Sequence, residues 1–192
     1  GDVYKRQDVG CYGAEGFETP HLDRLAAEGV RFTDFHVAQA VCSASRAAFL
    51  TGCYSERVGI LGALGPSARH GLDPGEETLA ELLKEEGYAT CMVGKWHLGH
   101  RAPFLPTEQG FDEAFGLPYS NDMWPLDDAG EPKRGYPALQ MLDGDGFGEP
   151  VETLAQQAEL TERYTVRALD FIARSREKPF FLYLAHSMPH VP

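Results

Sequence analysis

Apolar residues recur along this 192-residue chain at two spacings, one typical of helices and one typical of strands. Helical spacing and capping residues predict helices over 20–29, from Cys42 over 42–52, after a capping box formed by Thr78 and Glu81, and over about 161–175. Short apolar runs predict strands over 30–37, 88–93 and 180–184. Two segments with little periodicity, 52–75 and 100–150, are expected to be loops, and a loop as long as the second is usually functional.

Strands that alternate with helices indicate an α/β fold, with three layers and a mainly parallel sheet between the helices. In such folds ligands bind beyond the carboxyl ends of the strands. Cys42, Lys95, His97 and His190 all follow predicted strands. This end of the sheet is therefore where we expect the functional site.

The composition narrows the class of protein. A formal net charge of -12 argues against a nucleic-acid-binding surface, although a cleft can still hold a local basic pocket. The four cysteines (Cys11, Cys42, Cys53 and Cys91) lack the spacing of a zinc site, and their sequence positions do not reveal whether any of them pair. No stretch has the length of a membrane span, and no signal peptide opens the chain.

The clearest candidate for a functional motif is residues 41–52, Val-Cys-Ser-Ala-Ser-Arg-Ala-Ala-Phe-Leu-Thr-Gly. Cys42 and Arg46 are four residues apart, so on a helix they share a face. Free N–H groups at a helix N-terminus together with a guanidinium suit a tetrahedral oxyanion. Judged from this spacing alone, a buried structural cysteine at the start of an ordinary helix is an equally good interpretation.

Residues 41–52 as a whole resemble the signature of the formylglycine-dependent (type I) sulfatases, in which Cys-x-Pro/Ala-x-Arg is followed by Thr-Gly. Ala44 stands where many members have proline. The resemblance runs from about Asp8 to Pro192 and includes arylsulfatase-like elements. It implies an alkaline-phosphatase-like sulfatase domain and hydrolysis of sulfate monoesters.

In that family the cysteine is oxidised to an aldehyde, whose hydrate is the nucleophile, so the resemblance assigns this role to Cys42. One hydroxyl of the hydrate attacks sulfur, and the other later loses a proton, expels sulfate and restores the aldehyde. Arg46 would stabilise the hydrate and the nearby anion. An exposed helical arginine is the structural alternative for Arg46.

The other site residues implied by the resemblance lie further along the chain. Lys95 would hold the sulfate and His97 would act as the base on the second hydroxyl, and two-residue spacing puts both on one face of an extended segment while Trp96 points into the core. His190 would contact the ester oxygen and help to protonate the leaving group. Ser120 matches a substrate-side serine, although a single turn hydroxyl is nearly as often structural.

The family also uses a divalent ion, Ca²⁺ or Mg²⁺, held by adjacent aspartates after the first strand, by a later Asp-Asn pair and by the formylglycine made from Cys42. Hard oxygen ligands suit these ions. Here Asp8 has no adjacent aspartate, Asp127 and Asp128 lie in a loop, and the one asparagine, Asn121, precedes an aspartate. Apart from Cys42, the ligands are therefore expected to be missing from this sequence.

The two ends of the chain carry a further expectation. Residues 1–7 resemble translated sequencing-adapter DNA and are treated as foreign, which leaves 8–192 as the N-terminal part of a catalytic domain truncated at both ends. We expect such a fragment to be inactive by itself. The full-length protein would be periplasmic or secreted and would need a formylglycine-generating enzyme as a partner.

Two other functions remain open at this stage. A phosphonate or phosphodiester hydrolase of the same superfamily could use the same nucleophile and cations. A catalytically inactive sulfate- or carbohydrate-binding relative is the third alternative, although it would not need Cys42, Arg46, Lys95, His97 and His190 together. The identity of the sulfate ester and the oligomeric state are not encoded in any motif.

Overall fold

The computed structural model describes residues 9–133 and 135–190. Within them five strands form one sheet in the order β4-β3-β2-β1-β5. The central strand β1 (Ala89–Lys95) pairs in parallel with β2 (Glu113–Leu117) on one side and β5 (Phe180–Ala185) on the other. A hairpin of β3 (Leu139–Asp143) and β4 (Gly146–Val151) continues the sheet from β2 in antiparallel fashion.

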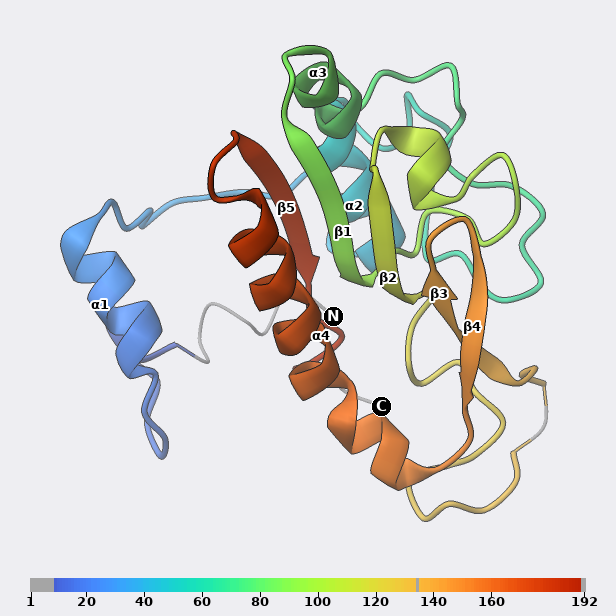
Figure 1. Ribbon diagram of the computed structural model, residues 1–192. Helices are drawn as coiled ribbons and strands as arrows, with labels where there is room; N and C mark the ends of the chain where they lie inside the picture. The colour runs from blue at the N-terminus through green and yellow to red at the C-terminus, as the bar shows by residue number, and fades with distance from the viewer. Residues whose placement is uncertain (1–8, 134, 191–192) are drawn as a thin grey trace.

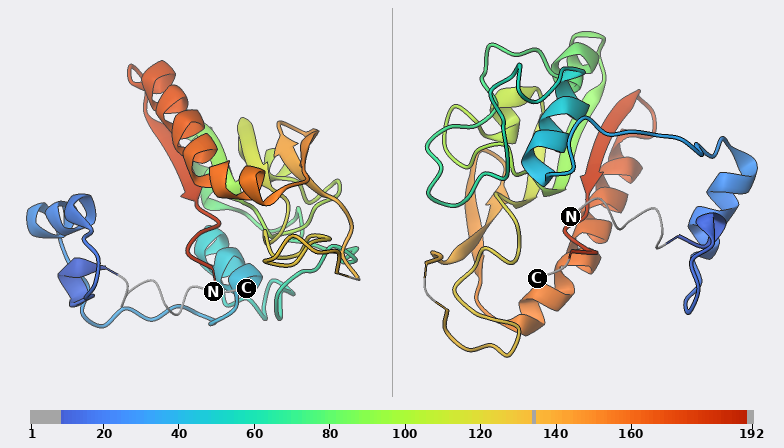
Figure 2. Two further views of the ribbon diagram at one scale, coloured as in Figure 1. Left: turned by 90° about the horizontal axis from the view of Figure 1, so that it is seen from below. Right: turned by 180° about the vertical axis from the view of Figure 1, so that it is seen from behind.

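Helices cover both faces of the sheet, so the predicted three-layer α/β fold is confirmed, with a sheet that is mixed rather than purely parallel. The long helix α4 (Leu154–Ser175) lies on one face, and α2 (Cys42–Thr51) with α3 (Leu79–Glu85) lies on the other (Figures 1 and 2). Short 3-10 turns occur at η2 (Gly10–Tyr12) and η3 (Pro106–Gln109).

The period-two alternation of β1 builds a core on each face. Met92 packs with residues of α2 and α3, as does Trp96 just beyond the strand, whereas Cys91 and Val93 pack against α4. These side chains are fully buried, so both cores are closed to bulk solvent. A strand held from both faces is a rigid support for the residues that follow it.

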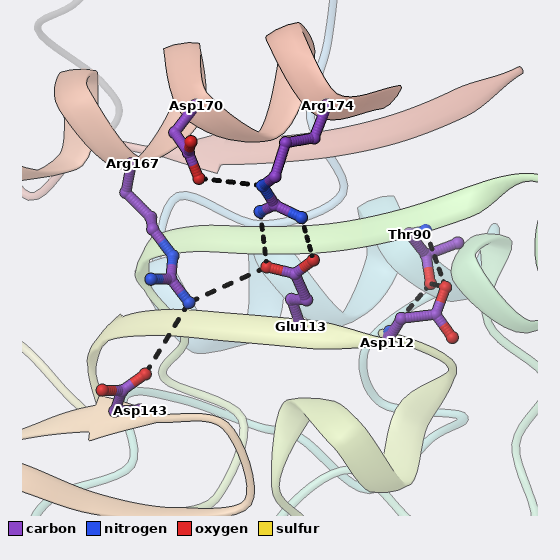
Figure 3. A network of polar contacts seen from close by, with 7 residues as sticks. All are labelled: Thr90, Asp112, Glu113, Asp143, Arg167, Asp170 and Arg174. Atoms are coloured by element: carbon purple, nitrogen blue, oxygen red, sulfur yellow. Dashed lines mark hydrogen bonds and ion pairs between the residues drawn. The ribbon is translucent and has the colours of Figure 1, made fainter. Parts of the chain in front are cut away.

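Arginines of α4 form ion pairs with carboxylates at the ends of β2 and β3 (Figure 3). Arg174 donates one hydrogen bond to each carboxylate oxygen of Glu113, both at 3.0 Å. Arg167 lies 3.7 Å from Glu113 and 3.8 Å from Asp143. These pairs join α4 to the first residue of β2 and the last residue of β3.

Three predicted elements differ from the structure. The strand expected over 30–37 is absent: this segment is irregular, and its side chains Val30, Phe32 and Phe35 are 82%, 61% and 67% exposed, because no neighbouring strand pairs with it in the described residues. The segment 100–150 is not one loop, since it contains η3, β2, β3 and β4. Short strands next to glycines have too few residues for a clear alternation.

The last helix begins seven residues earlier than predicted, at Leu154. Its start is fixed by a capping box in which the Thr153 side chain accepts from the Gln156 N–H and the Gln156 side chain accepts from the Thr153 N–H. The capping box predicted at Thr78 and Glu81 is present, with distances of 2.7 and 3.2 Å.

Helix α1 (Pro20–Glu28) stands away from the rest of the molecule, joined to it by the irregular segment 29–41 (Figures 1 and 2). Leu22 and Leu25, which are three residues apart and so lie on one face of the helix, are 50% and 66% exposed. Thr19 precedes the helix at the N-cap position, but its hydroxyl accepts from the Gly10 N–H and donates to Asp23 instead of capping the helix.

Candidate active site

Cys42 is the first residue of α2, as predicted. The preceding Val41 is extended and gives no side-chain cap, so the start of the helix is unblocked by a side chain. The Cys42 side chain is buried, with 8% exposure, and all four cysteines are free thiols. Ser43 holds this end of the helix by accepting a 3.0 Å hydrogen bond from the Leu64 N–H.

Arg46 lies one turn further along α2 and reaches the end of β1. Its Nη1 donates to the Lys95 carbonyl at 2.5 Å and to the Tyr183 hydroxyl at 3.3 Å. The residue is 7% exposed, and its Nε is buried without a hydrogen-bond partner among the described residues. The exposed-arginine alternative is therefore wrong, and a buried guanidinium with a spare donor is suited to an anion.

Lys95 ends β1 and is 2% exposed, so its ammonium is held inside the molecule. Its Nζ donates to Ser120 Oγ at 3.0 Å. Trp96 is fully buried in the core, as predicted. His97 departs from the extended segment that the sequence predicted, because its φ of 63° turns the chain sharply after the strand.

The protonation state of His97 follows from its surroundings. Burial lowers the pKa of His97 to about 3, and the charges of Lys95, Arg46 and His190 contribute in the same direction, against one hydrogen bond that opposes them. The ring is therefore neutral near pH 7. Its Nε2 lies 2.7 Å from the Leu64 carbonyl, which can only accept, so Nε2 carries the proton.

The other ring nitrogen of His97, Nδ1, consequently carries a lone pair and no proton. Nδ1 is buried and has no hydrogen-bond partner among the described residues. A neutral imidazole whose Nδ1 has no donor can accept a proton, and because the pKa of the ring is lowered to about 3, it holds that proton weakly.

Ser120 and His190 complete the arrangement from two further loops. Ser120 Oγ lies 3.3 Å from His190 Nε2 and accepts the hydrogen bond from Lys95. Ser120 is 1% exposed and His190 is half-buried. A contiguous series of contacts thus runs from Arg46 through Lys95 and Ser120 to His190.

The structure brings five predicted site residues together: Arg46, Lys95, His97, Ser120 and His190. Cys42 lies one helical turn from Arg46 on α2. Sequence reasoning missed Tyr183, which contacts Arg46, and Asp122, whose Oδ1 lies 4.0 Å from His190 Nδ1. The Ser120-Asn121-Asp122 spacing was the available signal for Asp122, since residues i and i+2 of a turn can reach one ring from two sides.

The donors of this cluster do not form a cation site by themselves. The groups beside Lys95 are an arginine, two histidines and a serine, and positive charge repels a metal ion. Within 9–133 and 135–190, no group of three or more His, Cys, Asp or Glu side chains is arranged to hold a metal. Asp8 lies outside the described residues, and the exposed Asp127 instead accepts from the Ala129 and Glu131 N–H groups.

Fold and cluster together define an α/β protein with buried cationic side chains at the carboxyl ends of parallel strands. The Sulfatase family model matches residues 1–192, and the chain belongs to the sulfatase family. None of the helices in the described ranges is long and apolar enough to cross a membrane.

Curated relatives agree with this assignment. Arylsulfatase G of Mus musculus is 40% identical over 204 residues, which cover 96% of this chain and 39% of that protein. Arylsulfatase A of Homo sapiens is 42% identical over 201 residues, which cover 96% of this chain and 39% of that protein. N-acetylgalactosamine-6-sulfatase of Homo sapiens is 42% identical over 196 residues, covering 96% and 37%. The chain thus spans about two fifths of the length of these relatives.

Solved sulfatase structures share the fold. The PsFucS1 sulfatase from Pseudoalteromonas sp. superposes with a TM-score of 0.81 at 27% identity, over 96% of this chain and 42% of that one. Ps i-CgsB in complex with k-i-k-neocarrahexaose gives a TM-score of 0.79 at 30% identity, over 97% and 43%. BT4656 in complex with its substrate D-glucosamine-2-N,6-O-disulfate gives a TM-score of 0.70 at 27% identity, over 96% of this chain and 32% of that one.

Proposed function

We propose that the full-length form of this protein hydrolyses sulfate monoesters, with a formylglycine made from Cys42 as its nucleophile. The observation that carries the proposal is a buried cluster beside the start of α2, made of two cations, Arg46 and Lys95, and the neutral ring of His97. A sulfuryl group carries negative charge on its oxygens, and preorganised cations in a dry site stabilise it strongly. Sulfated glycans are the proposed substrates, since Ps i-CgsB was solved with k-i-k-neocarrahexaose and BT4656 with the sulfated sugar D-glucosamine-2-N,6-O-disulfate.

The modification answers a chemical requirement. Converting the Cys42 side chain to an aldehyde removes two electrons, takes up water and releases the sulfur, so it requires a maturation enzyme and its oxidant. The hydrated aldehyde has two hydroxyl groups on one carbon. One hydroxyl oxygen bonds to sulfur while the ester oxygen leaves as an alcohol, and the second can then lose its proton so that sulfate departs and the aldehyde forms again.

The residues of the cluster have distinct roles in this proposal. Lys95 and Arg46 stabilise the sulfuryl oxygens, and Lys95 also holds Ser120. His97 takes the proton of the second hydroxyl at Nδ1, the nitrogen that its hydrogen bond to Leu64 leaves unprotonated. His190 gives a proton to the departing oxygen through Nε2, which faces Ser120.

A divalent cation remains part of the proposal for the full-length protein, as Ca²⁺ or Mg²⁺. The formylglycine at position 42 would be one ligand, and the others would come from outside the described residues. Such an ion, when bound, supplies further charge stabilisation at the sulfuryl oxygens. A periplasmic or secreted location likewise stays a prediction.

Mass spectrometry of the peptide that contains position 42 tests the nucleophile. The full-length protein is produced together with a formylglycine-generating enzyme, and we expect an aldehyde at Cys42 and turnover of sulfate esters. Cys42→Ser should abolish turnover after the first transfer, because a serine ester cannot expel sulfate through a second hydroxyl. Cys53→Ser, which changes another free cysteine, should leave conversion and turnover intact.

An unmodified thiol at Cys42, under conditions that convert a known sulfatase, contradicts the proposed nucleophile. Aryl phosphodiesters and phosphonates form the comparison panel for substrate class. Faster turnover of these than of sulfate esters would assign the protein to the phosphoryl-transfer alternative.

A further inference from the structure

The loop after β2 places a carboxylate against His190, on the side of the ring opposite Ser120. Asp122 Oδ1 lies 4.0 Å from His190 Nδ1, while Ser120 Oγ lies 3.3 Å from Nε2. The two nitrogens of one imidazole therefore face two residues that are only two positions apart in sequence.

The backbone explains how residues 120 and 122 reach the same ring. The Met123 N–H donates to the Ser120 carbonyl at 3.0 Å, which closes a tight turn over 120–123. Gln157 of α4 donates to the Asn121 carbonyl at 2.8 Å, and Lys133 donates to the Asp122 carbonyl at 2.9 Å. The turn is thus held from two outside elements and presents its side chains in a fixed geometry.

The carboxylate itself has an unused acceptor. Oδ1 of Asp122 is buried and has no hydrogen bond among the described residues, apart from its 4.0 Å approach to His190. An unpaired buried carboxylate oxygen is costly, so a nearby donor gains by turning toward it. A 4.0 Å separation is short enough for a small ring tilt or one bridging water to complete the contact.

We propose that Asp122 is a positioning residue for His190, an inference that rests on the proposed function of this site. A carboxylate can only accept, so it selects the form of the ring that carries a proton on Nδ1. In the neutral ring this leaves Nε2 free to accept from the Ser120 hydroxyl. In the charged ring it directs the second proton, on Nε2, toward the departing oxygen.

The carboxylate has a second effect on the same ring. A proton on both nitrogens makes His190 positive, close to the ammonium of Lys95 that is bonded to Ser120. Like charges in a buried site disfavour one another. Asp122 supplies the opposite charge on the far side of the ring, so that the acid form of His190 can exist next to the sulfate-holding cations.

The first test requires no turnover. Nitrogen NMR of ¹⁵N-histidine-labelled full-length protein, with His190 assigned by the signals lost in His190→Gln, reports which ring nitrogen bears the proton. The wild-type neutral ring should carry its proton on Nδ1. Asp122→Asn, whose amide can donate to Nδ1, should shift the proton to Nε2, whereas Asp128→Asn in the same loop, where the side chain is exposed, should change nothing.

The second test uses converted, active enzyme and a series of leaving groups. Acid assistance matters most for poor leaving groups, so Asp122→Asn should lower kcat on alkyl sulfates by about ten- to a hundredfold and change it by less than about threefold on nitrophenyl sulfate. In His190→Ala, the added Asp122→Asn change should cost nothing further, because it acts through the missing ring.

The outcomes separate the two proposals. An unchanged position of the proton in Asp122→Asn, or equal losses on alkyl and nitrophenyl sulfates, overturns the positioning role. A shifted proton in a protein that turns over no sulfate ester supports the role of Asp122 and overturns the proposed function instead.

Discussion

Lys95 depends on the glycine immediately before it. Gly94 has a φ of 109° and is paired with Gly116 of β2 and Ala185 of β5. A Cβ atom built on Gly94 would lie 2.1 Å from the Ala185 carbonyl oxygen, and one on Gly116 would lie 1.8 Å from the Gly94 oxygen. The three strands therefore leave no room for a Cβ atom one residue before the site lysine.

Gly94→Ala should accordingly destabilise the fold severely. The left-handed conformation alone costs on the order of 1–3 kcal/mol for a side-chain-bearing residue, and the backbone clash adds to it. Gly146→Ala in β4, where the added Cβ meets nothing within 4 Å, is the matched control and should be nearly neutral. Urea unfolding of both variants measures the difference in stability. Equal urea midpoints for the two variants would contradict the clash expected at Gly94.

The neutral ring of His97 predicts a specific acid sensitivity. The unfolded chain takes up a proton here below the ordinary pKa of 6.5, whereas the folded chain does so only near 3. Since the unfolded state binds more protons between these values, the free energy of unfolding falls as the pH drops from 6.5 toward 3. Each unit of difference in pKa corresponds to about 1.4 kcal/mol, so the loss amounts to several kcal/mol at most.

Replacing His97 tests whether its ring is neutral in the folded protein. His97→Gln should flatten the decline of the urea midpoint between pH 6.5 and pH 4, whatever it does to stability at neutral pH. His36→Gln, at an exposed histidine beside Asp34, should keep the wild-type slope. An identical pH slope in the His97 variant would mean that the ring is protonated in the folded protein.

At the scale of elements, α4 and β2 are joined by the paired hydrogen bonds between Arg174 and Glu113 (Figure 3). Hydrogen bonds to Glu113 and then Asp170 raise the pKa of Arg174, so it stays charged. Because the pair is partly exposed, its contribution should be modest and sensitive to salt.

Arg174→Gln should therefore lower Tm by a few degrees at most, and the difference from wild type should shrink in molar salt. Arg176→Gln, which changes a highly exposed pair with Glu177, is the control and should have no measurable effect. Scanning calorimetry at low and high salt makes the comparison. A loss that persists in molar salt would indicate that Arg174 acts through packing rather than charge.

Predictability from the sequence depended on how much local information each element carries. The capping box at Thr78 and the start of α2 at Cys42 are local signals, and both were predicted correctly. The hairpin of β3 and β4 was not predicted, because its pairing with β2 is set by distant contacts. The segment 30–37 alternates like a strand, yet pairing, not alternation, makes a strand.

The site divides in the same way, into residues with a local signal in the sequence and contacts that form only between distant segments. The family resemblance named Cys42, Arg46, Lys95, His97, Ser120 and His190, and the structure gathers the last five, although their catalytic roles stay predictions. The hydrogen bond of His97 to Leu64 has no signal in the sequence, because it joins residues 33 positions apart. The positive φ of His97 has none either, because it falls on a residue other than glycine. The approach of Asp122 to His190 likewise spans segments that meet only in the folded sheet.

At the scale of the whole molecule, an apolar surface lies beside α2 and β5. Segment 35–38, α2 and the end of β5 line a cavity of about 780 Å³, around which Phe35, Phe49 and Tyr54 are 67%, 59% and 75% exposed. Phe49 stacks on Tyr183 with ring centroids 5.6 Å apart. An exposed apolar surface beside the edge strand β5 favours self-association.

We therefore expect the 192-residue chain alone to bind an apolar fluorescent dye and to associate as its concentration rises. Phe35→Ser combined with Phe49→Ser should reduce both effects several-fold, because it removes apolar area from the rim of this cavity. Phe147→Ser, at a 49% exposed position on β4, serves as the control and should change little. Dye fluorescence and light scattering measure the two effects, and no difference between the variants would exclude this surface as their source.

The burial of Cys42 has a consequence for the order of events during biosynthesis. Its thiol is 8% exposed at the first residue of a helix packed on the sheet, so a second enzyme has little access to it once β1 and β5 have come together. The proposed conversion to an aldehyde is then a step for the nascent, still unfolded chain. Folding rate and modification rate would compete, and a variant that folds faster could emerge less active with its native structure intact.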